Sequence, residues 1–578
     1  MAPASLENDI QSWLQNTVKL DEFTEKDIKK HGVLYEAVVP ASKIREVAKE
    51  FLSRDYFLES LTAVDFSECF ELVYHFNHWS PAKRSCVKVL VPKRHSEPFD
   101  RHPERSEGSQ GKLREESQKR DPSASSSPQD DAIAPSIASI YKSANWYERE
   151  VFDMFGVRFD GHPHLTRILL PESSTIHPLL KSFKGEPKGS DVEQSLKLIE
   201  EDKAGFDVSY PQSISQHQSD YYLNLGPQHP STHGVLRILL HLSGERVLDG
   251  EPIIGYSHRH HEKMMEIQTY LACWPNMGRL DYLAAMSYNF GYALLIEKAM
   301  GIQPPPRVEY VRVLTTELNH LASHLLWMAA FLMDLGAFTP LFYALDDREQ
   351  ILDILELATG ERLTYDYYRF GGLLNDIPED MIPAIKKFIP GFKKRLKDYE
   401  NLIEKNVIFK NRTQKLAVLT KESALQYGVT GPCLRAIGVP VDLRRDEPYS
   451  IYPKLDFNIP TRTEGDVYAR YWVRMRELEE SLKIIQQVIE KIPAGDITLG
   501  KLPKNVPKGE YYSCVESARG FFGIYLVSDG TLNPYRIKLR TPSFSNLNAV
   551  VELLPGCVMA DAIAVLGSLD IVLPEIDR

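Results

Sequence analysis

Residues 307–333, RVEYVRVLTTELNHLASHLLWMAAFLM, decide the fold of the larger part of this chain. Three prolines precede the segment, and proline suits the first turn of a helix because that turn does not need its amide hydrogen. Leucines then recur at spacings of three and four residues, at Leu314, Leu318, Leu321 and Leu325. The pattern predicts one long helix with an apolar stripe facing a buried core.

A second long helix is predicted over residues 466–492, where apolar and aromatic side chains form one stripe. Segments typical of strands lie on both sides of these helices, at residues 221–225, 235–242, 521–527 and 535–540. Turns are predicted at residues 243–245 and 528–530. Residues 219–578 are therefore predicted to form a mainly α-helical domain with peripheral β elements.

The first 185 residues have a different pattern. A helix is predicted over residues 41–52, after Pro40. Strands are predicted where β-branched, aromatic and aliphatic residues gather, at residues 32–39, 57–66, 71–78 and 85–91. Residues 1–185 are thus expected to form a small α/β domain, and the whole chain an α+β fold.

Two polar stretches interrupt these patterns. Residues 94–133 contain one aromatic and almost no aliphatic side chains, so they cannot bury enough surface to offset the entropy of ordering. We predict a disordered insertion there, inside a domain, because structured patterns resume at Ile137. Residues 186–218 are rich in Pro, Gly, Ser and Gln and are predicted to be the linker between the two domains.

The composition excludes several classes of protein. The net charge of −11 argues against a general nucleic-acid binder. The six cysteines are scattered and form no C-x-x-C pair, which disfavours a zinc ribbon, an Fe–S cluster held by this chain and a redox-active dithiol. The longest apolar run, residues 325–333, is too short to span a bilayer. We expect a protein of the reducing cytoplasm, held at any membrane by another chain.

The first candidate site is GPQHPSTHG, residues 226–234. His229 and His233 are four residues apart, but Pro230 between them makes a metal-binding helix improbable. The segment is either a structural turn or a rigid loop that presents an imidazole for proton transfer. Spacing alone does not choose between His229 and His233.

Three further segments carry candidate residues. GRLDY (278–282) marks a helix start and contains Tyr282, and DLG (334–336) places Asp334 at the end of an apolar helix. Asp334 is either a simple helix-end carboxylate or the partner of a histidine, whose pKa it would then raise. HRHHEK (258–263) contains Arg259 and is either a solvated charged patch or a group of cations near an anionic cofactor.

In this order, these motifs resemble the respiratory NADH:quinone oxidoreductase, complex I. GPQHPSTHGVLR, HRHHEK, GRLDY, ELNHLASHLLW, DLGAFTP and RFGG are similar to the D subunit of that family, as is the stretch from PYRIKLRTPSF to GSLDIVL. The resemblance covers essentially all of residues 219–578, and several long motifs in a fixed order make it specific.

The smaller part resembles the C subunit of the same complex. SANWYEREVFDMFG (143–156) is close to the signature of that subunit, and the similarity runs over residues 30–93 and 137–181. The signature predicts a short helix over residues 145–155 that ends at Gly156, with Arg149 and Asp153 spaced as an i, i+4 pair. The family role of docking and assembly implies structural roles for the charged residues of this signature, Glu148, Arg149, Glu150 and Asp153. The chain as a whole resembles a fusion of the bacterial C and D subunits.

The family of the D subunit is related to the large subunit of nickel-iron hydrogenases, which bind nickel through two C-x-x-C pairs. These pairs would fall around residues 259–263 and 567–572, and neither region contains a cysteine. Nickel therefore lacks thiolate ligands, which excludes a hydrogenase, and no metal is expected in this chain. The resemblance implies a quinone cavity beside a 4Fe–4S cluster that the B subunit holds.

The resemblance also assigns residues to the quinone reaction. The quinone-contacting histidine and tyrosine of the family fall on His233 and Tyr282, and the carboxylate that supports the histidine falls on Asp334. The arginine next to the cluster falls on Arg259. A reduced quinone needs two protons, and hydroxyl and imidazole groups are suitable donors.

One position departs from the family. Many members carry a histidine near the cluster where this chain has Thr364. Threonine cannot take up a proton when the cluster is reduced, so our hypothesis is a cluster potential that depends weakly on pH and suits a low-potential quinone such as menaquinone. Redox titration of the cluster at several pH values tests this, and a slope near ~60 mV per pH unit contradicts it.

The resemblance implies a quinone substrate, menaquinone or ubiquinone, and no redox cofactor held by this chain alone. It implies partner subunits B, I, H and A and the peripheral-arm subunits E, F and G, no nucleic acid, and a peripheral place on the cytoplasmic side of the inner membrane. Quinone reduction would drive proton translocation by the membrane arm. The alternative is a pure scaffold that only assembles the peripheral arm.

Overall fold

The computed structural model describes residues 4–18, 20–81, 83–93, 132–184, 220–227 and 234–578. Its N-terminal part is a five-stranded sheet in the order β1-β2-β5-β4-β3, antiparallel except for the parallel pair β2–β5. The strands are β1 (Glu22–Glu25), β2 (Tyr35–Val38), β3 (Tyr56–Asp65), β4 (Cys69–His78) and β5 (Ser85–Pro92). The helices are α1 (Ala4–Thr17), α2 (Ile28–His31), α3 (Ile44–Ser53) and α4 (Lys142–Phe155).

These elements confirm the helix predicted over residues 41–52 and the four predicted strands, with small shifts at their ends. Helix α4 ends as predicted at Gly156, whose φ of 80° is easily reached by glycine. The predicted pairing of Arg149 with Asp153 is wrong. Arg149 donates to the backbone carbonyls of Thr166 and Arg167, and Asp153 accepts from Arg167 Nη1 at 2.6 Å.

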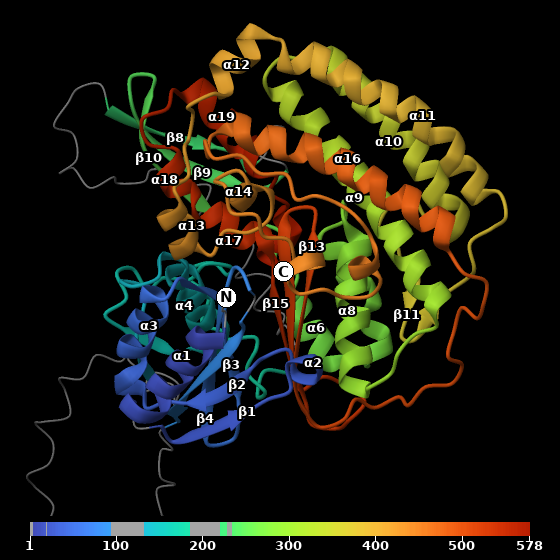
Figure 1. Cartoon of the computed structure of the whole chain (residues 1–578). Helices are drawn as coiled ribbons and strands as arrows, with labels where there is room; N and C mark the ends of the chain where they lie inside the picture. Colours follow the sequence, from blue (N-terminus) through green and yellow to red (C-terminus); the bar gives the residue numbers. More distant parts are fainter. Residues whose placement is uncertain (1–3, 19, 82, 94–131, 185–219, 228–233) are drawn as a thin grey trace, which may run out of the picture.

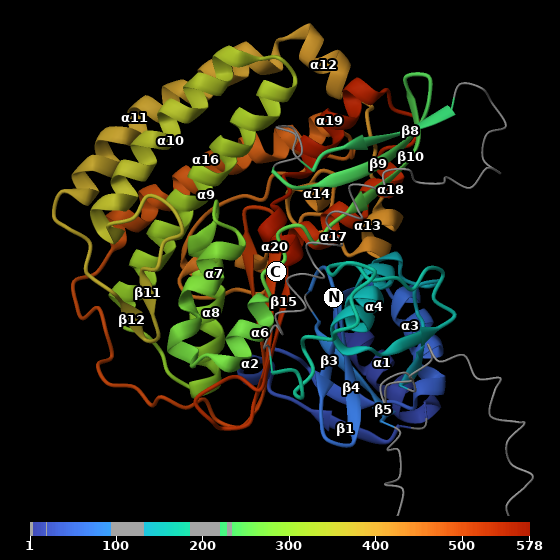
Figure 2. The same ribbon diagram turned by 180° about the vertical axis from the view of Figure 1, so that it is seen from behind.

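The larger part is mainly helical. Its helices are α6 (His261–Ile267), α7 (Trp274–Leu280), α8 (Ala285–Met300), α9 (Pro306–Asp334), α10 (Phe338–Thr359), α11 (Met381–Tyr399), α12 (Val407–Thr413), α13 (Lys421–Tyr427), α14 (Pro432–Arg435), α15 (Leu443–Asp446), α16 (Val467–Lys491), α17 (Pro542–Asn548), α18 (Val550–Leu553), α19 (Met559–Leu569) and α20 (Leu573–Asp577). Figures 1 and 2 show α9, α10, α11 and α16 side by side, at the end of the molecule away from the N-terminal part. The two long helices predicted from sequence are α9 and α16, and the four leucines of α9 are fully buried.

Short sheets complete the larger part. The first contains β8 (Asp220–Leu225), β9 (Arg237–Ser243) and β10 (Arg246–Ile253), and the second contains β13 (Gly509–Ser517), β14 (Gly520–Ser528) and β15 (Arg536–Arg540). The small pairs are β6 (Ile133–Pro135) with β7 (Arg158–Asp160), and β11 (Tyr368–Arg369) with β12 (Gly372–Leu373). Of the β elements expected at the periphery, β8–β10 lies at one edge of the molecule, whereas every residue of β14 and β15 is buried. The α+β fold class is confirmed.

The predicted linker, residues 186–218, lies outside the described residues. The predicted insertion overlaps them only at Ala132 and Ile133. Both are folded, since Ala132 is buried and Ile133 begins β6, so the prediction of disorder is wrong for these two residues. Among the described residues no helix combines the length and the apolar character that crossing a membrane requires.

The two parts share one hydrophobic core. Strand β15 lies against β3, and Arg536 donates to the carbonyl of Ala63 at 3.2 Å. A set of six buried charged residues, which we call the interface cluster, joins α4 to the larger part: Glu150, Glu262, Glu266, Arg536, Lys538 and Arg578. Glu150 binds both Lys538 and Arg578, the latter at 3.0 Å. Glu150 of the charged signature therefore joins α4 to the larger part.

Candidate functional site

Tyr282 lies in the short connection between α7 and α8. The preceding residue, Asp281, is fully buried and accepts hydrogen bonds from the backbone amides of Leu283 and Ala284, at 3.1 Å each. These bonds order the start of α8, as an acidic residue at a helix N-terminus does. Asp281 therefore fixes the backbone that carries Tyr282.

A series of buried ion pairs also stabilises this connection. Arg519 donates to Asp281 Oδ2 at 2.8 Å, to Ser323 Oγ of α9 at 3.1 Å and to Asp570 Oδ1 at 3.2 Å. The side chains of Arg519 and Asp281 are both fully buried. Sequence reasoning missed Arg519 and Asp570, because they lie 238 and 289 positions away from Asp281 in the chain.

Tyr282 itself is half-buried, and its hydroxyl makes no hydrogen bond to the described residues. Burial raises the pKa of Tyr282 above its ordinary value, and Asp281 and Asp570 add to the increase while Arg519 opposes it. The hydroxyl is therefore protonated at neutral pH. It is chemically suited to donate a hydrogen bond to a ligand oxygen.

Asp334 is the last residue of α9 and is half-buried. It lies beside Gly567 of α19, where a side-chain carbon would come within 3.7 Å of Asp334 Oδ2. Asp570, at the end of the same helix, pairs with Arg519. The end of α19 thus lies beside Asp334 at Gly567. Through Asp570 and Arg519 it is also linked to Asp281, the residue that precedes Tyr282.

The two candidate histidines lie outside the described residues, so their roles and the pairing of His233 with Asp334 stay predictions. The flanking strands β8 and β9 are antiparallel neighbours, and the segment connects their ends. Gly226 has a φ of 90°, and a side-chain carbon there would lie 2.0 Å from the carbonyl oxygen of Leu236. Only glycine fits this close approach.

Arg259 is exposed and precedes α6. Its Nη2 lies 3.3 Å from His261 Nε2, and the other ring nitrogen of His261 contacts Asn276 at 3.1 Å. Burial lowers the pKa of His261 to about 4, so its imidazole is neutral at pH 7. Glu262 is buried against Arg536, so HRHHEK is not a uniformly solvated patch. Arg259 is an exposed cation of this segment.

Thr364 lies against the helix that leads to Tyr282. A side-chain carbon at Gly278 of α7 would approach the carbonyl oxygen of Thr364 to 3.4 Å. Thr364 has a φ of 51°, which is uncommon for a β-branched residue. Thr364 is thus packed against Gly278, the first residue of the GRLDY motif.

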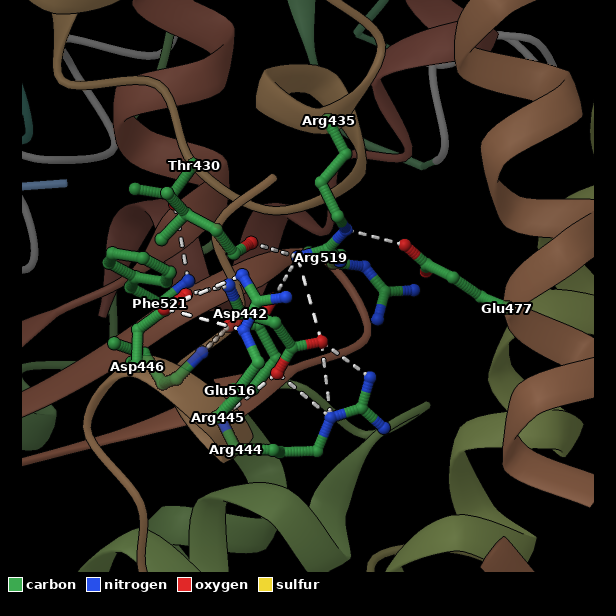
Figure 3. Close-up of polar contacts among 12 residues, drawn as sticks. Thr430, Arg435, Asp442, Arg444, Arg445, Asp446, Glu477, Glu516, Arg519 and Phe521 are labelled. Carbon is green, nitrogen blue, oxygen red and sulfur yellow. Dashed lines mark hydrogen bonds and ion pairs between the residues drawn. The ribbon is translucent and has the colours of Figure 1, made fainter. Parts of the chain in front are cut away.

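A second polar centre lies inside the helical bundle, where only apolar packing was predicted. His320 and His324 of α9 meet Glu477 of α16, with His324 Nε2 2.9 Å from His320 Nε2 and 3.0 Å from Glu477 Oε2. All three side chains are buried. Arg435 binds the other oxygen of Glu477 at 2.7 Å (Figure 3). The signal that could have found the centre is the pair of histidines at i and i+4 inside the apolar helix ELNHLASHLLW.

These three residues are the one group of three His, Cys, Asp or Glu side chains among the described residues whose ligand atoms converge, within 4.8 Å. The contacts of 2.9 and 3.0 Å are shorter than the spacing of about 3.3 Å that tetrahedral zinc imposes on its ligands. A divalent ion there would also face the guanidinium of Arg435. The geometry suits hydrogen bonding better than a metal.

The cysteines take no part in either centre. All six are free thiols, and five are buried, as expected for small core residues. Within the two regions where the hydrogenase cysteines would fall, residues 259–263 and 567–572, His261, Glu262 and Asp570 each already bind a neighbouring side chain. The residues present therefore do not fit a nickel site.

Comparison with known proteins identifies the family. The model of the respiratory-chain NADH dehydrogenase 49 kDa subunit matches residues 334–505 and 500–578, and that of the 30 kDa subunit matches residues 122–189. The D subunit of NADH-quinone oxidoreductase from Desulfotalea psychrophila is 54% identical over 360 residues, which are 62% of this chain and 97% of the relative.

Two relatives carry both parts in one chain. The C/D subunit of NADH-quinone oxidoreductase from Gluconacetobacter diazotrophicus is 39% identical over 475 residues, covering 77% of this chain and 79% of the relative. The C/D subunit from Methylococcus capsulatus is 38% identical over 491 residues, covering 78% and 82%. The predicted resemblance to fused C and D subunits is confirmed. The chain belongs to the family of NADH-quinone oxidoreductase C/D subunits.

Proposed function

We propose that this chain is the quinone-reducing and docking subunit of an NADH:quinone oxidoreductase. The larger part forms one wall of the quinone site, and the smaller part docks and assembles the peripheral arm. The observation that carries the proposal is Tyr282, a half-buried tyrosine with a protonated hydroxyl and no hydrogen bond to the described residues, on a backbone fixed by Asp281 and Arg519.

Each residue has a defined task in this reaction. Tyr282 donates a hydrogen bond, and then its proton, to one quinone oxygen. His233 does the same at the other oxygen, and Asp334 orients and supports its imidazole. Arg259 is an exposed cation that favours the arrival of negative charge beside the neighbouring cluster.

The electrons come from outside this chain. A 4Fe–4S cluster held by the B subunit is their source. Such a cluster would supply single electrons to the quinone. The partners are subunits B, H, I and A and the peripheral-arm subunits E, F and G. The complex lies on the cytoplasmic face of the inner membrane, and its membrane arm translocates protons.

The test is Tyr282→Phe in the assembled complex. Removal of the hydroxyl is expected to abolish most quinone reduction, by roughly 10²-fold or more, because general acid catalysis contributes this much. Electron transfer from NADH to an artificial acceptor and the set of assembled subunits should be unchanged. The matched control is Tyr256→Phe, since Tyr256 is 49% exposed. Normal quinone reduction by Tyr282→Phe would favour the alternative, a purely structural scaffold.

A further inference from the structure

A series of five buried side chains crosses the core from β13 to α9. Glu516 accepts from Arg435 Nη1 at 2.8 Å, and Arg435 Nε donates to Glu477 at 2.7 Å. Glu477 contacts His324 at 3.0 Å, and His324 contacts His320 at 2.9 Å. Figure 3 shows Arg435 reaching from α14 toward Glu477 on α16. The proposed quinone chemistry uses none of these residues.

Further carboxylates attach to the same series. Asp442 binds Arg444 at 2.6 Å, and Arg444 binds Glu317 of α9 at 3.0 Å. Asp442 also lies 3.9 Å from Arg435. We call the whole set the histidine–carboxylate network: His320, His324, Glu317, Asp442, Glu477, Glu516, Arg435 and Arg444. Every member is at most 4% exposed.

The charges of this network do not balance. It contains four carboxyl groups and two guanidinium groups, so full ionisation leaves a charge of −2. The bordering charges cancel: Arg474 and Arg519 offset Asp281 and Asp570, and Asp446, which accepts from the Asp442 amide, pairs with Arg445. An uncompensated charge in a buried region costs several kcal/mol, and a carboxylate there takes up a proton instead.

The structure indicates which carboxyl group holds that proton. Burial, followed by the negative charge of Asp442, raises the pKa of Glu516 to about 7, against the opposing effect of Arg435. Burial acts in the same direction on Glu477, but Arg435 and His324 hold the pKa of Glu477 well below its usual range. Glu516 is therefore protonated over part of the neutral range while Glu477 stays ionised.

The opposite end of the network can accept a proton. An ionised carboxylate only accepts hydrogen bonds, so His324 Nε2–H donates to Glu477 and also faces His320 Nε2. Burial lowers the pKa of both histidines, and His320 additionally faces the cations Arg444 and Arg435. Both imidazoles are thus neutral at rest. The Nδ1 atom of His324 is buried without a hydrogen-bond partner among the described residues.

The network shares a charged neighbour, Asp570, with the site of Tyr282. Asp570 acts electrostatically on Tyr282 and also on His324. Arg474, the second charged neighbour of His324, lies 3.8 Å from Asp570. Negative charge that develops at Tyr282 makes protonation of His324 more favourable, and positive charge does the reverse.

We propose that the histidine–carboxylate network is a proton-storing site of the quinone reaction, in which Glu516 holds a proton at rest and His324 binds another when Tyr282 has given up its own. The step moves only protons. The added proton comes from bulk water, binds His324 Nδ1 and leaves again when Tyr282 is reprotonated. The claim that the network stores a proton is based on the count of its charges. The claim that quinone reduction uses this proton rests on the proposed function.

The first test measures storage without any quinone. A carboxyl group with a raised pKa in the folded state destabilises the protein increasingly as pH rises from about 4.5 to about 7. Glu516→Gln removes this penalty. Its melting temperature relative to wild type should therefore rise by at least about 2 °C between pH 5 and pH 8 in the full chain.

The matched control is Glu480→Gln. Glu480 is on α16, three residues after Glu477, and is 8% exposed, but it binds Asn458 and Lys483 rather than the network. Its melting temperature relative to wild type should not vary with pH in this way. A Glu516→Gln difference that is constant from pH 5 to pH 8 overturns the proposal.

The second test measures use in the assembled complex. In the wild type, kcat for quinone reduction should depend on an ionisation near pH 7. Glu516→Gln should lose that dependence without a change in KM for quinone. Glu480→Gln should keep it. An unaltered pH profile in Glu516→Gln overturns the coupling to the reaction. If the proposed function is wrong, Tyr282→Phe will reduce quinone at the normal rate. The melting-temperature test of proton storage is independent of that result.

Discussion

The interface cluster and the histidine–carboxylate network are both buried, yet the pKa of one carboxyl group, Glu262, is lowered in the first while that of another, Glu516, is raised in the second. Glu262 of the cluster is 5% exposed and Glu516 of the network is 3% exposed. Burial alone would raise the pKa of both groups. Lys538, Arg536 and Arg578 instead bring the pKa of Glu262 to about 2, whereas Asp442 adds to burial and the pKa of Glu516 rises to about 7.

The difference lies in the number of opposite charges. The interface cluster has three carboxylates and three cations, Lys181 adds a partly exposed cation at Glu266, and these attractions join the two parts of the chain. The network has twice as many carboxylates as guanidinium groups. Burial strengthens both effects, because a low dielectric increases pair attraction and also the cost of an unpaired charge. Buried carboxylates that are matched by cations therefore stay ionised and stabilise the interface. A buried carboxylate without a matching cation binds a proton instead.

The largest expected effect comes from breaking the balanced cluster. Glu150→Ala leaves Lys538 and Arg578 without their shared carboxylate, and should lower the free energy of unfolding by about 3–5 kcal/mol. Denaturant unfolding of the full chain measures the loss. The control is Glu46→Ala, whose partner Lys43 is 44% exposed and whose loss should be about 0.2–1 kcal/mol. Equal losses would refute a special role for the interface.

The next effect is an acid sensitivity that Glu262 confers. Its pKa is lower in the folded chain than the ordinary 4.5, so its contribution is complete above that pH and is lost as pH falls toward about 2. The stability difference between wild type and Glu262→Gln should shrink by about 2 kcal/mol between pH 6 and pH 3. Thermal unfolding across this range measures it. A difference independent of pH would show that Glu262 is not held ionised.

The smallest expected effect comes from giving the interface cluster an excess of carboxylates, as in the histidine–carboxylate network. Lys538→Met leaves the interface cluster with three carboxylates and two guanidinium groups, and should raise the pKa of Glu262 toward its ordinary value. The change in stability between pH 6 and pH 3 should then be about 1 kcal/mol smaller than in wild type. Lys43→Met, at an exposed lysine, is the control. If the acid sensitivity stays unchanged, charge balance does not set the pKa of Glu262.

The sequence predicts single helices and their ends well, because the residues that determine them are neighbours in the chain. The leucine spacing of α9, the stripe of α16 and the glycine at the end of α4 all lie within a few residues of what they determine. Partners that are distant in sequence leave no such pattern. Arg149 and Asp153 had the spacing of a pair, yet each binds groups more than ten residues away.

The same limit explains what was missed in the candidate site. Tyr282 and Asp334 were predicted from motifs, whereas Arg519, 238 residues from its partner Asp281, had no local signal. His324 could be noticed as a polar residue in an apolar helix. Its partner Glu477 is 153 residues away, and only the packing of α16 on α9 brings the two together.

The interface cluster also bears on how the two parts came to share one chain. Its contacts join side chains from α4, α6, β15 and Arg578, and no peptide bond between the two parts is needed to form them. A covalent connection adds effective concentration rather than new contacts. Gene fusion and fission are then nearly neutral for this pair, consistent with relatives that match only the larger part. Chains severed between residues 186 and 218 should still elute together in size-exclusion chromatography.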